Sequence, residues 1–325
     1  MMNRKIMKSA AALALAAALT TGSASALFGG KKDEEAPEGA PTVQDGELST
    51  YRDIPAEGQL QAADEEGGEL TYAVADEPKK GTVTIEGASF TYTPDEGMTG
   101  KDSFTFTATD PEGNTSLPGK VRIVIEKPRS GVEYADMEGN PAARAAQHLA
   151  EEGIYTGAKI GASYYFQPSQ PVTRSEFLAM ALEAAGREVT AVTMTGFADD
   201  ESIPTWAKAY AAAGVADGVI QGRRTAGGAA FYGNDPITFN EAATVLDRVL
   251  DLGDVNLDVW YAGREAVPSW AAQAVANMEA VSVLSAGSFG SLTMEQAVTR
   301  ANAAQMLSAA KTLMDGAGSS SGWFQ

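Results

Sequence analysis

Two arginines stand at equivalent places where helices are expected to start. Arg174 and Arg300 each follow a threonine suited to capping a helix. A guanidinium group binds a carboxylate through two hydrogen bonds, and the unpaired amides and dipole of a helix start also attract anions. We therefore predict that both arginines contact an anionic ligand, and that alanine at both positions weakens binding without lowering the melting temperature. The alternative is a solvated side chain in the first helical turn.

Catalytic side chains are scarce in this sequence. Cysteine is absent and His148 is the only histidine, expected on a helix. The 43 acidic residues place some carboxylates near one another in any fold, so they are no specific sign of a glycan hydrolase with paired carboxylates. We predict a protein without enzymatic activity, and keep a cell-wall glycan hydrolase as a disfavoured alternative.

Four acidic residues in expected turns or strand ends have oxygens of the kind that calcium prefers. They are Asp64, Asp102, Asp110 and Glu112. Asp also favours turns for conformational reasons alone, and we prefer that interpretation. No cofactor is predicted, and calcium bound by these four residues is the alternative.

The start of the chain and its charge indicate the compartment and exclude some partners. Residues 1–26 have a basic start, a short apolar stretch and an Ala-Ser-Ala end, which predicts a signal peptide and a secreted protein with no membrane insertion after cleavage. The net charge of −19 disfavours nucleic acid as a partner. Residues 27–47 are rich in glycine and charge, and predict a flexible linker.

Residues 48–128 predict a small all-β sandwich, because short alternating segments are bounded by turn residues. These segments are residues 70–74, 82–85, 90–92, 104–107 and 121–125. Stretches such as Gly-Thr-Val-Thr at 81–84 and Thr-Asp-Pro-Glu-Gly-Asn at 109–114 resemble bacterial cadherin-like, immunoglobulin-fold repeats. That resemblance implies a spacer or adhesion module.

The rest of the chain predicts helices and contains an internal repeat of about 60 residues. Val-Thr-Arg-Ser-Glu at 172–176 recurs as Ile-Thr-Phe-Asn-Glu at 237–241 and Val-Thr-Arg-Ala-Asn at 298–302. Pro-Thr-Trp-Ala at 204–207 recurs as Pro-Ser-Trp-Ala at 268–271. After a linker at 129–133, we expect repeats at 134–190, 191–253 and 254–315, then a disordered tail at 316–325. Because two short helices bury little surface alone, the repeats should pack together.

Each repeat predicts a helix, a glycine-bearing turn, a short loop and a capped helix. Thr173 and Glu176 form the pattern of a capping box, repeated by Thr238 and Glu241, whereas Asn302 is a weaker partner for Thr299. An apolar stripe follows each cap, in the first repeat at Phe177, Met180, Ala181 and Ala184. In the second repeat, the face of the preceding helix is expected to consist of Trp206, Ala209, Tyr210 and Ala213.

This pattern of helix pairs and caps resembles the S-layer homology (SLH) domain. The resemblance covers about residues 134–315 and rests on Phe-Ala-Asp at 197–199, Ile-Pro-Thr-Trp-Ala at 203–207, Gly-Val-Ile-Gln-Gly at 218–222 and the threonine caps. It implies a three-pronged, pseudo-threefold all-α module. It also implies that grooves between the prongs bind an anionic secondary cell-wall polymer, often pyruvylated, at the cell surface.

The predicted polymer-binding residues include six besides the two arginines. They are Trp206, Trp270, Gly157, Gly222, Arg223 and Lys159. The tryptophans could stack on a sugar or lie in the core, and we weigh these alternatives equally. Phe239 replaces the arginine of the second repeat, so one or two working clefts are expected, not three. A monomer anchored to the wall is preferred, and a subunit of a surface lattice is the alternative.

Overall fold

The computed structural model describes residues 37–258, 267–285 and 292–319. Its contacts divide them into a unit that ends at Gln147 and a unit that starts at His148, each described separately below. The predicted signal peptide and residues 27–36 of the predicted linker lie outside the described residues, as do residues 320–325 of the tail. In the described part of the chain, no helix has the length and apolarity needed to cross a membrane.

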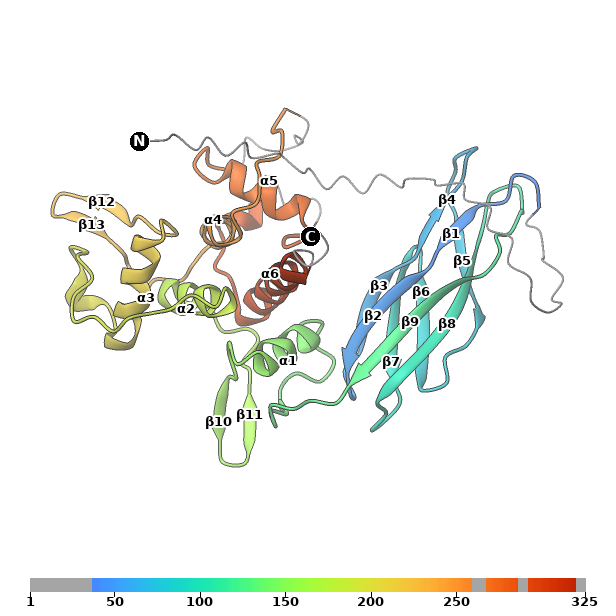
Figure 1. The fold of residues 1–325 in the computed structure, drawn as a ribbon, viewed down its shortest axis with the longest axis horizontal. Helices are drawn as coiled ribbons and strands as arrows, with labels where there is room; N and C mark the ends of the chain where they lie inside the picture. Colours follow the sequence, from blue (N-terminus) through green and yellow to red (C-terminus); the bar gives the residue numbers. More distant parts are fainter. Residues whose placement is uncertain (1–36, 259–266, 286–291, 320–325) are drawn as a thin grey trace, which may run out of the picture. The chain divides into compact units, whose positions relative to one another are not determined.

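The first unit is a β-sandwich (Figure 1). Its four-stranded sheet has the order β2-β9-β8-β5, and its three-stranded sheet the order β3-β7-β6. β2 and β9 are parallel, and the other neighbouring strands are antiparallel. The strands are β1 (Thr42–Gln44), β2 (Gly46–Tyr51), β3 (Ala56–Gln59), β4 (Gln61–Ala63), β5 (Thr71–Asp76), β6 (Gly81–Glu86), β7 (Ser89–Pro94), β8 (Gly100–Thr109) and β9 (Gly119–Glu126).

The alternating residues of these strands make the core of the sandwich. Phe104 and Phe106 of β8 and Ile123 of β9 are buried together with Phe90 of β7, from the other sheet. The rings of Phe90 and Phe104 meet edge to face with their centroids 5.2 Å apart. The predicted all-β region is therefore confirmed.

The sandwich starts earlier than the sequence predicted, because β1 and β2 begin inside residues 27–47. Val43 packs against the core. The carboxylate of Asp45 accepts a hydrogen bond from the amide of Lys120 (2.9 Å) and pairs with Arg122 (3.0 Å). These contacts order a segment whose composition alone favoured a linker.

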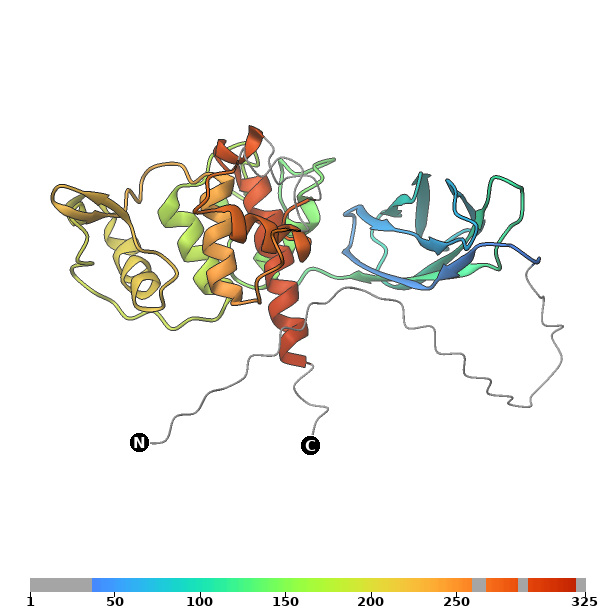
Figure 2. The same cartoon turned by 90° about the horizontal axis from the view of Figure 1, so that it is seen from above.

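The remainder of the chain is helical, as predicted. Figure 1 shows α2, α4 and α6 next to one another, and Figure 2, turned by 90°, also places these three helices side by side. The helices are α1 (Ala143–Glu151), α2 (Arg174–Ala184), α3 (Thr205–Ala216), α4 (Phe239–Leu250), α5 (Ala272–Ala280) and α6 (Arg300–Ser319). α6 extends into residues 316–319, which the sequence had assigned to the tail.

The predicted caps are present at α2, α4 and α6. The amide of Thr173 donates to Glu176 (2.8 Å), and the hydroxyl of Thr173 accepts from the amide of Glu176 (3.2 Å). Thr238 and Glu241 form the same box. In the third repeat the amide of Thr299 lies 3.4 Å from Asn302 Oδ1, which confirms a weaker reciprocal bond. The predicted apolar stripes behind the caps are buried.

The buried face of α3 differs from the prediction. Ala207, Ala211 and Gly214 are buried, whereas Trp206 is 51% exposed. A Cβ at Gly214 would lie only 3.2 Å from the side chain of Leu178 in α2. Small residues on α3 therefore allow close packing against α2, and this packing turns the tryptophan outward.

Three equivalent residues join the repeats in a closed ring. Val172 donates its amide hydrogen to Val298 (2.9 Å), Val298 donates to Ile237 (2.8 Å), and Ile237 donates to Val172 (2.9 Å). All three side chains are buried. Because a linear stack would leave its end repeats unpaired, this ring shows that each repeat contacts both others.

The first helices of the three repeats (α1, α3 and α5), here called the outer helices, follow the same cyclic order. α3 of the second repeat packs on α2 of the first, and α5 of the third packs on α4 of the second. The circle closes where His148 of α1 and Ser308 of α6 share a hydrogen bond of 2.7 Å. Each outer helix thus packs on the capped helix of the preceding repeat.

Two short hairpins stand where the sequence predicted loops. β10 (Ala158–Ile160) pairs with β11 (Ser163–Tyr165), and β12 (Arg223–Thr225) pairs with β13 (Gly228–Ala230). Each precedes a capped helix, and together they carry Lys159 and Arg223.

Candidate functional site

The helix starts do not offer free amides to an anion, contrary to the argument from sequence. Arg174 donates its backbone N–H to the carbonyl of Asp235 (2.9 Å), and Ser175 donates to Gly233 (2.9 Å). Arg300 donates its N–H to Gln170 (2.8 Å). Packing between neighbouring repeats occupies these amides, so any anion binding there must come from side chains.

The side chain of Arg174 is mostly buried at the junction of the first and second repeats. Its Nη1 lies 2.6 Å from Glu241 Oε1, and its Nε donates to the carbonyl of Phe231 (2.9 Å). The side chains of Arg174 and Glu241 are 11% and 13% exposed. Arg174 therefore links two repeats, with the capping-box glutamate of the next repeat as its partner.

A second arginine shares the same carboxylate. Arg223 Nη2 lies 2.7 Å from Glu241 Oε1, and the Arg223 side chain is 52% exposed. Its guanidinium lies over the ring of Tyr232, 5.5 Å from the centroid. Two cations share the carboxylate of Glu241, and Asp235 also attracts Arg223, so the charge of Arg223 is partly compensated and reaches the solvent through its exposed side chain.

Charge states at this junction follow from its contacts. Burial by itself raises the pKa of Glu241, but attraction to Arg174 and the hydrogen bond from Arg223 outweigh it and lower the pKa below its ordinary value. The hydrogen bond to Glu241 raises the pKa of Arg223. Glu241 and Arg223 are thus charged at neutral pH, and the exposed guanidinium of Arg223 can attract an anion.

Arg300 holds the equivalent place at the junction of the third and first repeats. Its Nη1 donates to Gln167 Oε1 (2.5 Å) and lies 3.4 Å from the carbonyl of Phe166. Its Nη2 is 3.9 Å from Glu176 Oε1, and its side chain is 18% exposed. Ala158 occupies the position that Arg223 has in the next repeat, so the second arginine is missing.

The third junction lacks both members of the pair. Phe239 replaces the arginine of the second repeat, and Asn302 replaces the capping glutamate of the third. The residue after the capping threonine is thus an arginine when the capping box of the following repeat contains glutamate. It is a phenylalanine when that position of the following repeat is asparagine. The paired replacement agrees with a role for these arginines in joining repeats.

The predicted glycines act on the backbone. Gly157 and Gly222 have φ angles of 70° and 73°. A Cβ would lie 2.5 Å from the carbonyl oxygen of Tyr165 at Gly157, and 2.8 Å from that of Ala230 at Gly222. Only glycine fits, because the hairpin strands approach here.

Two non-glycine residues with left-handed backbone support the junctions. Gln167 (φ 58°) and Tyr232 (φ 55°) are equivalent by the 65-residue offset, and each contacts an arginine. Such conformations cost about 1–3 kcal/mol and cluster at functional sites. The sequence analysis did not single out either residue. A signal was present, because each comes two residues after the end of a hairpin strand and directly follows a buried phenylalanine.

Other predicted polymer-binding residues lie on the surface. Trp206 and Trp270 are 51% and 56% exposed, which rules against the core alternative. Trp206 packs edge to face on Tyr210, with centroids 6.4 Å apart. Lys159 Nζ lies 5.1 Å from the centroid of the Tyr164 ring. These side chains are available to a ligand, but none of the contacts described above joins them to Arg174 or Arg223.

The four calcium candidates do not form one site. Asp102 lies near the start of β8 and Asp110 directly follows its end, about 26 Å away by the rise of a strand. Asp102 accepts hydrogen bonds from the amides of Lys79 and Lys80 and from the hydroxyl of Tyr92, and Asp110 accepts from Asn114. Over the described ranges, no three His, Cys, Asp or Glu side chains are placed to hold a metal ion. The turn interpretation fits Asp102 and Asp110 better.

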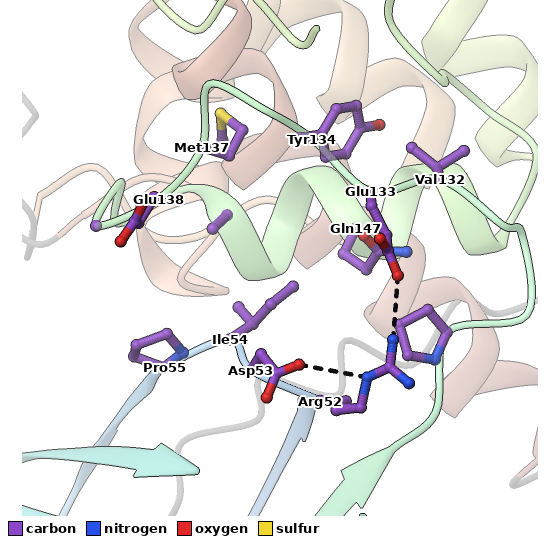
Figure 3. Close-up of a pocket in the computed structure, with 13 residues that line it drawn as sticks. Arg52, Asp53, Ile54, Pro55, Val132, Glu133, Tyr134, Met137, Glu138 and Gln147 are labelled. Carbon is purple, nitrogen blue, oxygen red and sulfur yellow. Dashed lines mark hydrogen bonds and ion pairs between the residues drawn. The ribbon is translucent and has the colours of Figure 1, made fainter. Parts of the chain in front are cut away.

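A separate pocket lies within the first unit (Figure 3). Arg52, Ile54, Glu133, Tyr134 and Met137 are among the residues that line it. Among the described residues that line it, Arg52 is the one lysine or arginine, and it pairs with both Asp53 (3.3 Å) and Glu133 (3.1 Å). Because two carboxylates neutralise this cation, the pocket is a poorer anion site than the Arg223 junction.

Comparison with known proteins identifies the first unit. Residues 38–124 match the model of the bacterial Ig domain family. A stretch of 101 residues is 33% identical to the surface-layer 125 kDa protein of Lysinibacillus sphaericus, covering 31% of this chain and only 8% of that protein.

Solved structures align only over parts of the chain. An endo-fucoidan hydrolase of glycoside hydrolase family 107 aligns over 28% of this chain and 17% of its own, with 18% identity and a TM-score of 0.23. The fibronectin(III)-like modules of Clostridium thermocellum CbhA align over 27% and 47%, with 17% identity and a TM-score of 0.20. The family match and the β-sandwich together identify residues 38–124 as a bacterial Ig domain, which a helical region follows.

Proposed function

We propose that this chain is a secreted bacterial surface protein that its helical repeats hold non-covalently to an anionic cell-wall glycan. The Ig domain serves as a spacer or adhesion module. The observation that carries the proposal is the half-exposed Arg223 beside the mostly buried pair of Arg174 and Glu241. A chain with a net charge of −19 needs such a local cation to hold an anion.

The chemistry of the junction suits a carboxylated sugar. Arg223 can donate two hydrogen bonds to a carboxylate, such as that of a pyruvyl ketal. The ring of Tyr232, 37% exposed, lies beside it and offers an apolar face to the sugar. Arg174 acts through the junction: it neutralises Glu241, so that Arg223 keeps its charge for the ligand.

The three junctions are proposed to differ in strength. The junction of the first and second repeats has two arginines, and that of the third and first has Arg300 alone. The remaining junction has Phe239 and Asn302. We expect the first to bind most tightly and the last to contribute little.

Two similarities support this function. The helical region resembles SLH repeats in its caps, turns and tryptophans, and part of the chain is similar to a protein named for the surface layer. The proposal includes export by the predicted signal peptide, a monomeric state, and neither enzymatic activity nor a cofactor.

Co-sedimentation with wall sacculi tests the proposal. The full chain is mixed with intact sacculi and with sacculi stripped of their secondary polymer. We expect it to pellet with intact sacculi and to stay in solution with stripped ones. Equal pelleting with both preparations would refute the proposal.

A surface-lattice subunit is a second candidate, favoured by the name of the surface-layer relative. It requires extensive contacts between copies. Sedimentation velocity of the chain, with and without calcium, separates the two candidates, since a lattice subunit forms large assemblies and an anchor stays monomeric.

A further inference from the structure

The exposed face of the four-stranded sheet of the Ig domain gathers positive charge. Residues 36–128 contain seven lysines and arginines and eighteen acidic residues. Four of those seven cations, but only two of the eighteen acids, line one hollow on this face. They are Lys79, Lys101, Lys120 and Arg122, with Glu47 and Asp102. Cations therefore outnumber acids among the side chains of this domain that line the hollow, although the domain as a whole is acidic.

Strand register places three of these cations close together. Arg122 and Lys120 both point outward from β9, two residues apart, or about 7 Å. Lys101 of β8 is paired in register with Val124, and is therefore a diagonal neighbour of Arg122, about 7–8 Å away. Like charges so close on one face weaken a sheet. An anion bound across them would offset that cost.

The ammonium groups of two lysines on this face have no hydrogen bond or ion pair with the described part of the chain. Arg122 pairs with Asp45, but no hydrogen bond or ion pair within the described residues holds the ammonium groups of Lys101 and Lys120. Asp102 is occupied by Tyr92 and two backbone amides. The lysines are exposed.

The remaining side chains of the face favour a carbohydrate. Ser103 of β8 is the register partner of Arg122 and lines the hollow, so a hydroxyl group lies beside the cations. The hydroxyl of the next outward residue, Thr105, donates to Asp76 (2.9 Å). Val124 is the one exposed apolar side chain among the residues that line the hollow, whereas a protein interface has an apolar core. Duplex DNA, with a charge about every 1.7 Å, would be repelled by this acidic chain. A polysaccharide with one carboxylate per sugar has a lower charge density than duplex DNA, so this acidic chain repels it less.

We propose that this face of the Ig domain binds a linear polysaccharide that carries carboxylate groups. The site is separate from the arginine junction of the helical repeats. It would let the Ig domain act as an adhesion module toward acidic glycans.

Isothermal titration of the full chain with polygalacturonate tests this proposal. All proteins carry Arg223→Gln, so that the junction in the helical region contributes less. We expect Lys101→Gln and Lys120→Gln each to raise the Kd about 2- to 5-fold, the range of exposed charge contacts. Lys127→Gln removes another exposed lysine, which does not line the hollow, and is expected to leave the Kd unchanged.

Three results would overturn the proposal. One is the absence of polygalacturonate binding at low salt, and another is equal binding of neutral dextran. The third is a loss in Lys127→Gln as large as in the hollow variants, which would indicate an effect of net charge alone. Unchanged melting temperatures of the variants establish that they are folded.

Discussion

The pair of Arg174 and Glu241 should contribute measurably to the stability of the helical repeats. Its atoms lie 2.6 Å apart, and both side chains are nearly buried. Arg174 belongs to the first repeat, whereas Glu241 and the carbonyl of Phe231 that it contacts belong to the second, so the pair stabilises the contact between repeats. The prediction is a coupling free energy in a double-mutant cycle of Arg174→Met and Glu241→Gln.

The magnitudes follow from what each substitution leaves behind. After Arg174→Met, Glu241 keeps Arg223 at 2.7 Å, so the loss should be about 1.5–3 kcal/mol, the value of a charge-assisted hydrogen bond. Glu241→Gln leaves Arg174 without its carboxylate, and breaking a buried pair from one side costs about 3–5 kcal/mol. The double variant should therefore lose about 1.5–3 kcal/mol less than the sum. Arg300 and Glu176, at 3.9 Å and more exposed, should couple by less than about 1 kcal/mol.

Urea unfolding followed by tryptophan fluorescence gives these values. All four tryptophans lie after residue 205, so the signal reports the helical region and not the Ig domain. Urea is uncharged and does not screen the ion pair. A coupling near zero for Arg174 and Glu241, or one smaller than that of Arg300 and Glu176, would refute the argument. The prediction also reverses the expectation from sequence that loss of these arginines leaves the melting temperature unchanged.

Three further predictions concern the repeats. Phe239→Arg combined with Asn302→Glu should install the missing pair, so the double variant should unfold at higher urea concentration than either single variant; strict additivity would contradict this. The hydrogen bond from Lys208, with those from Thr195, lowers the pKa of Asp200 to about 2. Because the pKa is lowered, the ionised carboxylate stabilises the fold at pH values above the ordinary pKa of an aspartate, and this stability is lost as the pH falls toward 2. In urea unfolding, wild type and Asp200→Asn should therefore differ at pH 6 and converge near pH 2. A difference that stays constant with pH would contradict this. Gly222→Ala should destabilise by about 1–3 kcal/mol in the same assay, because its φ is 73° and its Cβ would approach a carbonyl; wild-type stability would contradict it.

Local patterns in the sequence predicted much of the fold. The capping boxes at Thr173 and Thr238 each lie within about one helical turn, and the stripe from Phe177 to Ala184 lies within about two, so spacing alone reveals them. Alternation likewise revealed the strands of the Ig domain. The boundary near Val43 was missed because its order depends on contacts with β4 and β9.

Contacts between repeats were not predictable in the same way. Arg174 meets Glu241 across 67 residues, and nothing local indicates this partner. The amides at the helix starts looked free because their acceptors, such as Asp235, belong to the next repeat. The outward position of Trp206 depends on the fit of Gly214 against Leu178. The joint replacement at Phe239 and Asn302 was visible in the sequence, but only the cyclic order shows that the two residues correspond.

The affinity of the full chain for purified, soluble wall polymer tests the central claim most directly. Arg223→Gln should raise the Kd about 10- to 100-fold, the equivalent of one charge-assisted hydrogen bond. Arg224→Gln is the matched control, because the next residue of the strand points to the opposite face of the hairpin. Equal affinity of the two variants, or no binding of the polymer by the unmodified chain, would contradict the account.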